Sequence, residues 1–125
     1  MKTAWITDDD QDMINAVRLM LKLLDYNVRP FYNARATAKT LLTGEMPDLM
    51  ILDINMPEVS GIDLLEFIRR NRRWDHIPVI MLSSEATDIQ VDEALKLGAD
   101  AYTFKPVTID ELESAINAAI RKRKK

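Results

Sequence analysis

The stretch from Leu49 to Asp53, with the sequence LMILD, decides the fold. Four consecutive apolar residues, opened by Pro47, are typical of a strand that is covered on both faces in the middle of a parallel sheet. The run ends at Asp53, so the strand delivers a carboxylate to its carboxyl end.

A second run of the same kind, Val79 to Leu82, ends at Ser83. Around these two runs, short apolar segments alternate with segments of helical periodicity, a pattern that predicts βα units and a parallel sheet. The sequence therefore predicts an α/β domain with five strands and five helices. The strands are expected at 3–7, 27–32, 49–52, 79–82 and 101–104, and the helices at 12–24, 34–43, 63–70, 88–97 and from 108 onwards.

The predicted helix ends carry residues that favour starting or stopping a helix. Asn33 is a good N-cap and Gly44 a good C-terminal stop. In the first helix we expect an apolar stripe of Met13, Val17, Met20 and Leu24, with Ile14 and Leu21 beside it. Two capping boxes are expected, Thr87 with Gln90 and Thr108 with Glu111.

Length and composition limit the possibilities. The 125 residues, of which 47% are hydrophobic and 30% charged, fit a single globular domain spanning 1–125. A net charge of −3 makes nucleic acid an unlikely partner for this domain. The chain has no cysteine and no run of the roughly 18 apolar residues that a membrane span requires. We expect a cytoplasmic protein without membrane contact.

Chemically reactive side chains follow the predicted strands. Asp8, Asp9 and Asp10 follow the first strand, Asp53 the third, Ser83 the fourth and Lys105 the fifth. Because the carboxyl ends of parallel strands meet at one edge of the sheet, and ligands bind there, these side chains should converge.

Such a group of carboxylates is repulsive unless a cation joins it. Oxygen ligands at a small open site suit Mg²⁺ or Mn²⁺. Lys105 adds a positive charge for a phosphoryl oxygen, and the Ser83 hydroxyl can donate a hydrogen bond. The residues therefore indicate phosphoryl transfer to a carboxylate, assisted by a metal.

The chain resembles the receiver domain of bacterial response regulators over nearly its whole length. The resemblance rests on the acidic cluster at 8–10, on Asp53-Ile54-Asn55-Met56-Pro57 with Gly61, on Ser83, and on Lys105-Pro106. It implies a flavodoxin-like, doubly wound five-stranded parallel sheet in the order 2-1-3-4-5, with five helices on its two faces.

The resemblance also implies a role for each residue. Asp53 is the phosphoryl acceptor, and Asp9 and Asp53 are direct Mg²⁺ ligands, with Asp8 acting through water. Asn55 gives its backbone carbonyl to the metal. Lys105 pairs first with Asp53 and then with the phosphoryl group, and the Lys105-Pro106 bond is cis. Ser83 is the switch hydroxyl, and Tyr102 is the aromatic residue that moves with it.

The implied function is phosphorelay signalling. A sensor histidine kinase or a phosphotransfer protein supplies the phosphoryl group, and the domain catalyses only its own phosphorylation and dephosphorylation. A downstream effector or a second copy is expected on the face formed by the fourth helix, the fifth strand and the fifth helix. Two residues depart from the family pattern: Thr7, where an apolar residue is usual, and Ser84, where Ala or Gly is frequent.

Other interpretations stay open. A haloacid dehalogenase-type phosphohydrolase also uses an aspartate at a strand end, but its D-x-D pattern would need an acid where Asn55 stands. A pseudo-receiver would bind partners without phosphate. We assign no function to His76, the one histidine, and we read the basic end at 121–125 as a solvated helix end or a linker.

Overall fold

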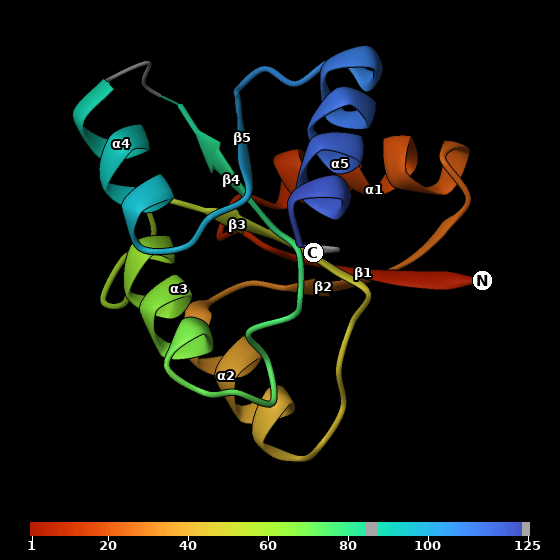
Figure 1. Ribbon diagram of the computed structural model, residues 1–125. Helices are drawn as coiled ribbons and strands as arrows, with labels where there is room; N and C mark the ends of the chain where they lie inside the picture. The colour runs from red at the N-terminus through yellow and green to blue at the C-terminus, as the bar shows by residue number, and fades with distance from the viewer. Residues whose placement is uncertain (85–87, 124–125) are drawn as a thin grey trace.

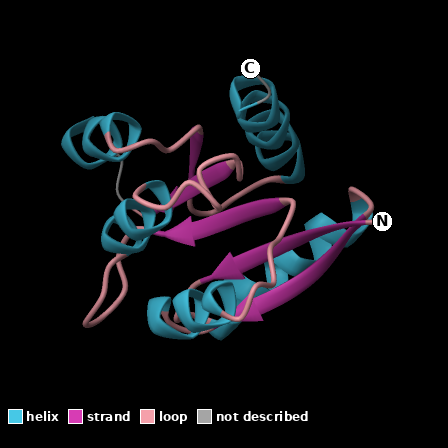
Figure 2. Ribbon diagram, turned by 60° about the horizontal axis from the view of Figure 1, so that its bottom comes forward, coloured by secondary structure: helices cyan, strands magenta, loops and turns pink. Residues whose placement is uncertain are grey.

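The computed structural model describes residues 1–84 and 88–123. Within them, strands and helices alternate strictly, and the strands form one parallel sheet in the order β2-β1-β3-β4-β5 (Figures 1 and 2). The strands are β1 (Lys2–Thr7), β2 (Tyr26–Phe31), β3 (Leu49–Asp53), β4 (Val79–Ser83) and β5 (Ala101–Phe104). The helices are α1 (Gln11–Leu23), α2 (Ala34–Leu42), α3 (Gly61–Arg69), α4 (Asp88–Lys96) and α5 (Ile109–Arg123).

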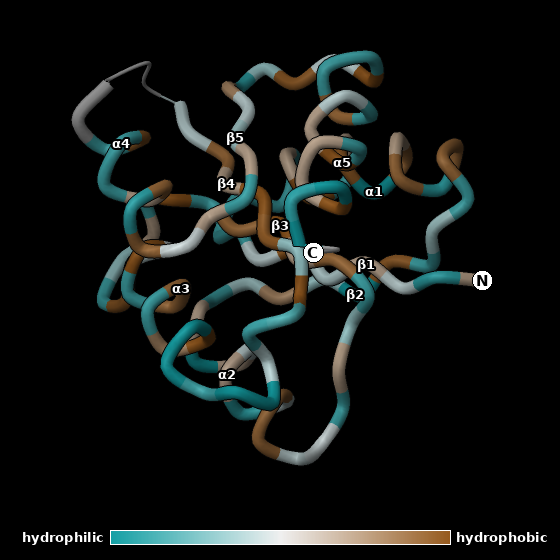
Figure 3. Tube along the Cα trace, in the orientation of Figure 1, coloured by the Kyte–Doolittle hydropathy of each residue, from teal (hydrophilic) through white to brown (hydrophobic). Residues whose placement is uncertain are grey.

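Helices cover both faces of the sheet. α1 and α5 pack on one face, and α2, α3 and α4 on the other (Figure 1). β3 explains why its sequence is apolar without interruption: Leu49 and Ile51 belong to the core on the α1–α5 side, while Met50 and Leu52 belong to the core on the α2–α4 side. Figure 3 shows hydrophobic residues concentrated along the central strands. The predicted fold class and strand order are confirmed.

The predicted apolar stripe of α1 is displaced. The fully buried residues are Ile14, Val17 and Leu21, whereas Met13 and Met20 are only partly buried at the border of the core. α1 packs against β1 and β2, so its Ile14 side is buried on the sheet and its Met13 side lies at the border of the core. Leu19 and Leu23 point outward, with 64% and 70% of their surface exposed.

The predicted helix starts agree with the structure to within two residues, and α1, α2, α3 and α4 each end one residue earlier than predicted. Asp10 caps α1 by accepting hydrogen bonds from the backbone N–H groups of Asp12 and Met13, and Asn33 caps α2. α3 begins two residues earlier than predicted because Ser60 and Asp63 form a reciprocal capping box. The S-x-x-D spacing at 60–63 is the sequence signal that was overlooked.

The remaining caps agree in part with the prediction. The Thr108 hydroxyl accepts the backbone N–H of Glu111 at 3.2 Å, and it donates to the Glu111 carboxylate at 2.9 Å. The side chain of Glu111 thus returns to the hydroxyl and not to the backbone of Thr108. The predicted box of Thr87 with Gln90 lies outside the described residues, because Thr87 is not described.

The basic end of α5 differs from the prediction. Arg123 is not solvated: its guanidinium lies against the carboxylate of Asp100, with Nε and Oδ1 2.6 Å apart. Lys122 donates to the backbone carbonyl of Ala99 at 3.2 Å. The interpretation of this end as a solvated helix terminus is therefore wrong for Arg123, while Arg121 and Lys122 are exposed. No helix in the described part of the chain is both long and apolar enough to cross a membrane.

Candidate phosphoacceptor and metal site

The sheet brings the predicted site residues to one edge. The strand arrows of Figure 2 all point the same way, so the chain segments that leave β1, β3, β4 and β5 emerge together. Asp8 and Asp53 are buried, with 0% and 2% of their surface exposed, and Ser83 is buried as well. Asp9 lies beside them but is exposed.

Lys105 connects the two buried carboxylates. Its Nζ lies 2.9 Å from Oδ2 of Asp8 and 3.3 Å from Oδ1 of Asp53. The predicted pairing of Lys105 with Asp53 is present, and the shorter contact with Asp8 is additional. The lysine side chain is itself mostly buried, with 16% of its surface exposed, so these ion pairs are shielded from solvent.

This environment changes the acidity of both groups. Burial, and next the charge of Asp8, raise the pKa of Asp53 to about 6, although Lys105 and the backbone N–H of Asn55 lower it. Burial alone would lower the pKa of Lys105, but its hydrogen bond to Asp8 and the negative charges of Asp53 and Asp8 raise it overall. Lys105 therefore stays charged at neutral pH, and Asp53 is mostly ionised but unusually basic for a carboxylate.

The acidic loop after β1 is held by backbone contacts. The N–H of Asp8 donates to the carbonyl of Phe31 at 3.0 Å, which extends the β1–β2 pairing by one residue. The Asp8 carboxylate in turn accepts the N–H of Asp10 at 2.9 Å. Asp8, Asp9 and Asp10 thereby have three different surroundings: buried beside Lys105, exposed beside the site, and at the N-cap of α1.

The loop after β3 folds tightly over the acceptor. The N–H of Ile54 donates to Leu82 at 2.9 Å, and the N–H of Gly61 donates back to Ile54 at 3.1 Å. A Cβ atom at Gly61 would lie 1.9 Å from the backbone oxygen of Asp53, so this position has no room for a side chain. Asn55 lies in this loop, and its N–H donates to Oδ1 of Asp53 at 3.2 Å.

β4 and β5 are joined at the site. The N–H of Lys105 donates to the carbonyl of Ser83 at 2.8 Å, which places these two residues side by side. Ser83 ends β4 in a buried position, whereas Ser84 is exposed. The predicted cis peptide bond between Lys105 and Pro106 is confirmed.

The acidic residues fit a metal ion. Asp8, Asp9 and Asp53 each offer a carboxylate oxygen, and these oxygens all lie within 4.8 Å of one another. Among the described residues, Oδ2 of Asp8 is buried and has no hydrogen bond of good geometry besides its ion pair with Lys105. One lysine cannot neutralise three carboxylates, so a hard divalent cation such as Mg²⁺ suits this donor set.

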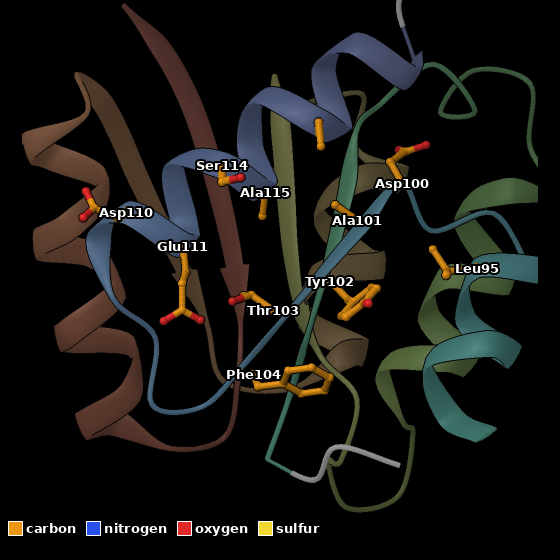
Figure 4. A pocket seen from close by; sticks show the side chains of 11 residues that line it. Leu95, Asp100, Ala101, Tyr102, Thr103, Phe104, Asp110, Glu111, Ser114 and Ala115 are labelled. Carbon is orange, nitrogen blue, oxygen red and sulfur yellow. The ribbon is translucent and has the colours of Figure 1, made fainter. Parts of the chain in front are cut away.

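Tyr102 lies away from this centre, on the outer face of β5. Its side chain is 43% exposed, and its ring meets that of Phe104 edge-on, with 5.4 Å between the ring centroids. The two aromatic rings line a pocket between α4, β5 and α5, with Leu95 on one wall and Glu111 on another (Figure 4). This is the face on which the sequence predicts a partner.

Comparison with known proteins identifies relatives of this site and fold. Residues 4–117 match the family described as the response regulator receiver domain. The chain is 33% identical to the chemotaxis protein CheY of Pseudomonas aeruginosa over 111 residues, which cover 89% of this chain and 90% of CheY. It is 35% identical to the KDP operon transcriptional regulatory protein KdpE of Escherichia coli, covering 98% of this chain and 52% of KdpE.

Solved structures agree with this assignment. A response regulator receiver domain protein from Clostridium thermocellum superposes with a TM-score of 0.87 at 27% identity, covering 99% of this chain and 98% of that one. A CheY-like receiver domain protein from Methanospirillum hungatei superposes with a TM-score of 0.84 at 27% identity, covering 99% of this chain and 97% of that one. The chain spans about half the length of several curated relatives, among them VanR of Enterococcus faecium at 50%. The chain belongs to the family of response regulator receiver domains, the signalling domains of two-component phosphorelays.

Proposed function

We propose that this domain accepts a phosphoryl group on Asp53 from the phosphohistidine of a sensor histidine kinase or phosphotransfer protein. The observation that carries the proposal is the bridge formed by Lys105 between the buried carboxylates of Asp8 and Asp53. In a purely structural ion pair, one carboxylate would suffice to neutralise the lysine, whereas Lys105 contacts two carboxylates. Here an excess of negative charge surrounds the Asp53 oxygen, and a cation is required to complete the site.

The transfer would be a single displacement at phosphorus. A carboxylate oxygen of Asp53 attacks the phosphorus atom, a new P–O bond forms, and the P–N bond to the histidine breaks, with the electron pair leaving on the imidazole nitrogen. Burial makes the ionised Asp53 a stronger nucleophile than a solvated carboxylate, since its pKa is about 6. Lys105, which pairs with the Asp53 carboxylate before the transfer, would pair with the phosphoryl oxygens after it.

Asp8, Asp9 and Asp53 would hold Mg²⁺, with the backbone carbonyl of Asn55 as a further ligand. When bound, the ion supplies positive charge that stabilises the equatorial phosphoryl oxygens. As the resemblance to the family implies, Asp53 and Asp9 would contact the ion directly, and Asp8, whose Oδ2 is paired with Lys105, would act through a water molecule.

The switch would involve Ser83 and Tyr102. Phosphate on Asp53 adds negative charge beside the end of β4, and the Ser83 hydroxyl can donate a charge-assisted hydrogen bond to it. Ser83 and Lys105 are linked through their backbones, so movement of the one is passed to the end of β5. Tyr102 on β5 would then turn, and the pocket between α4, β5 and α5 would change its shape for an effector or a second copy (Figure 4).

Intact-mass measurement tests the acceptor directly. The protein is incubated with Mg²⁺ and acetyl phosphate, and its mass should rise by one phosphate. Asp53→Asn should abolish the increase, whereas Asp92→Asn, which removes an exposed carboxylate on α4, should leave it intact. Full labelling of the Asp53→Asn protein would refute the assignment. Turnover of a free phosphomonoester would instead indicate a hydrolase, and absence of labelling would indicate a pseudo-receiver.

The wider context is part of the same proposal. The domain acts in signalling and catalyses only its own phosphorylation and dephosphorylation. Because relatives such as KdpE are about twice as long as the aligned segment, the output of the whole protein depends on what accompanies this domain. A cytoplasmic location remains the prediction from the cysteine-free sequence.

A further inference from the structure

Asp100 forms a second buried ionic site at the opposite end of the sheet from Asp53. Its carboxylate is 0% exposed and accepts three hydrogen bonds. Oδ2 accepts from Arg69 at the end of α3 and from the backbone N–H of Val79 at the start of β4, both at 2.9 Å. Oδ1 accepts from Arg123 at the end of α5, at 2.6 Å. One carboxylate thus joins a strand to two helices.

The two arginines are themselves held firmly. Arg69 donates to the carbonyls of Gly98 at 2.9 Å and Ile77 at 2.8 Å, and Arg123 donates to the carbonyl of Asp75 at 2.8 Å. Their side chains are 10% and 24% exposed. Hydrogen bonds to backbone carbonyls replace those to water that a guanidinium group loses on burial. Both arginine side chains are therefore held in one position.

Asp100 and Lys105 flank the same short strand. β5 has four residues and lies at the edge of the sheet, next to β4. At one end, the N–H of Asp100 donates to Val79 at 2.9 Å; at the other, the N–H of Lys105 donates to Ser83 at 2.8 Å. Figure 4 shows Asp100 and Phe104 at opposite ends of the strand. Slippage of β5 by one residue would turn every one of its side chains to the other face of the sheet.

We propose that Asp100, Arg69 and Arg123 form a positioning site that fixes β5 and thereby couples the C-terminal end of α5 to Lys105. The inference rests on the function proposed for Lys105 as the cation that receives the phosphoryl group. Arg123 holds Asp100, Asp100 holds the start of β5, and β5 presents Lys105 next to Ser83. Coupling between two sites is reciprocal. A change that separates Arg123 from Asp100 therefore weakens phosphoryl binding, and occupancy of the phosphoryl site tightens the contact of Arg123 with Asp100.

Beryllofluoride, a phosphoryl mimic, provides the test. It is titrated with Mg²⁺ into the wild type and into Arg123→Gln, and binding is followed by isothermal titration calorimetry. Arg123→Gln should raise the dissociation constant about fivefold or more, at the lower end of ordinary coupling between sites. Arg121→Gln removes an exposed arginine from the same turn of α5 and should bind like the wild type. Arg123→Lys keeps the charge and should fall between them.

Two further measurements separate positioning from loss of stability. Asn117→Gly weakens α5 at an exposed position without touching Asp100, and it should not change beryllofluoride binding. In amide NMR spectra, Arg123→Gln should shift the signals of Lys105 and Tyr102, whereas Arg121→Gln should not. Unchanged binding by a folded Arg123→Gln protein would overturn the coupling and leave the proposed function intact, as would weakened binding without any shift at Lys105. Failure of the wild type to bind beryllofluoride would refute the proposed function itself.

Discussion

Lys105 lies nearer to Asp8 than to Asp53: its Nζ is 2.9 Å from the first carboxylate and 3.3 Å from the second. One cation therefore balances two buried anions, with Asp9 close enough to share a metal with both. Burial of Asp53, and next the charge of Asp8, raise the pKa of Asp53, and Lys105 offsets this rise only in part.

The metal-free protein should lose stability as the pH rises from about 4 to 6. The pKa of Asp53 is about 6 in the fold, against 3.8 for a free aspartate, so the folded state binds more protons than the unfolded state within this interval. Protonated Asp53 contributes to the free energy of unfolding in full below pH 4, and this contribution is lost as the pH rises through 6. The difference between the two pKa values corresponds to about 3 kcal/mol. Urea unfolding between pH 4 and 7.5 measures it.

Asp53→Asn is the matched control for this pH dependence, since an amide of the same shape does not ionise. The wild type should lose unfolding free energy relative to the variant as the pH rises from about 4 to 6. Saturating Mg²⁺ should suppress this pH dependence. A difference that stays constant across this range would show that Asp53 titrates as an ordinary carboxylate.

Neighbouring aspartates should respond differently to Mg²⁺. Asp9→Asn removes a carboxylate ligand. It should weaken Mg²⁺ binding about tenfold or more, which is the usual size of such an effect at a metal site. Asp10→Asn should bind Mg²⁺ nearly as the wild type does, because asparagine caps a helix as well as aspartate. Fluorescence of Trp5, in the strand that leads to Asp8, and the rise in melting temperature with Mg²⁺ report both results. Equal weakening in the two variants would place the metal elsewhere.

Gly61→Ala should be among the most damaging single substitutions. The new Cβ would meet the backbone oxygen of Asp53 at 1.9 Å, and a backbone atom cannot move aside as a flexible side chain can. We expect a loss of about 3 kcal/mol or more, together with poor phosphorylation by acetyl phosphate.

Gly44→Ala serves as its comparison. Gly44 has a φ of 101°, which costs a residue with a side chain about 1–2 kcal/mol, but no atom lies within 4 Å of the added Cβ. Thermal unfolding should rank Gly61→Ala well below Gly44→Ala, and only the former should impair phosphorylation. Similar losses in both proteins would mean that backbone conformation, not crowding at Asp53, determines the effect.

Ser83→Ala should separate phosphorylation from its consequences. The variant keeps the Asp53 carboxylate and should still accept phosphate, but it lacks the hydroxyl that would bind the phosphoryl oxygen. Loss of one charge-assisted hydrogen bond of about 1.5–3 kcal/mol should reduce the active population about tenfold or more. Amide shifts on adding beryllofluoride should reach Tyr102 in the wild type and stay near Asp53 in the variant.

Ser84→Ala is the control, because Ser84 is the adjacent serine but is exposed. It should transmit the shift to Tyr102 as the wild type does. If the effects of the two substitutions are reversed, the switch hydroxyl belongs to Ser84.

Much of the sheet was predictable because its middle strands are buried on both faces. The runs at 49–52 and 79–82 indicated interior strands, and the structure extends each by one polar residue, Asp53 and Ser83. The alternation of strands and helices then placed Asp8, Asp53 and Lys105 at the same edge, and in the structure the Lys105 Nζ lies within ion-pair distance of both carboxylates. The apolar stripe of α1 was predicted less well, because Ile14, Val17 and Leu21 form its buried centre and Met13 and Met20 lie at the border of the core.

The α/β fold, and the set of residues that meet at the carboxyl edge of the sheet, could be predicted from local features. Apolar runs and the polar residues that end them are visible in the sequence, and parallel pairing of the strands brings those polar residues together. Only the tertiary structure decided that Lys105 is shared between Asp8 and Asp53, and that Asp100 binds Arg69 and Arg123. Arg69 and Arg123 stand 31 and 23 residues from Asp100 in the chain, on helices that pack against opposite faces of the sheet. No local pattern encodes their meeting, because it depends on where two packed helices end.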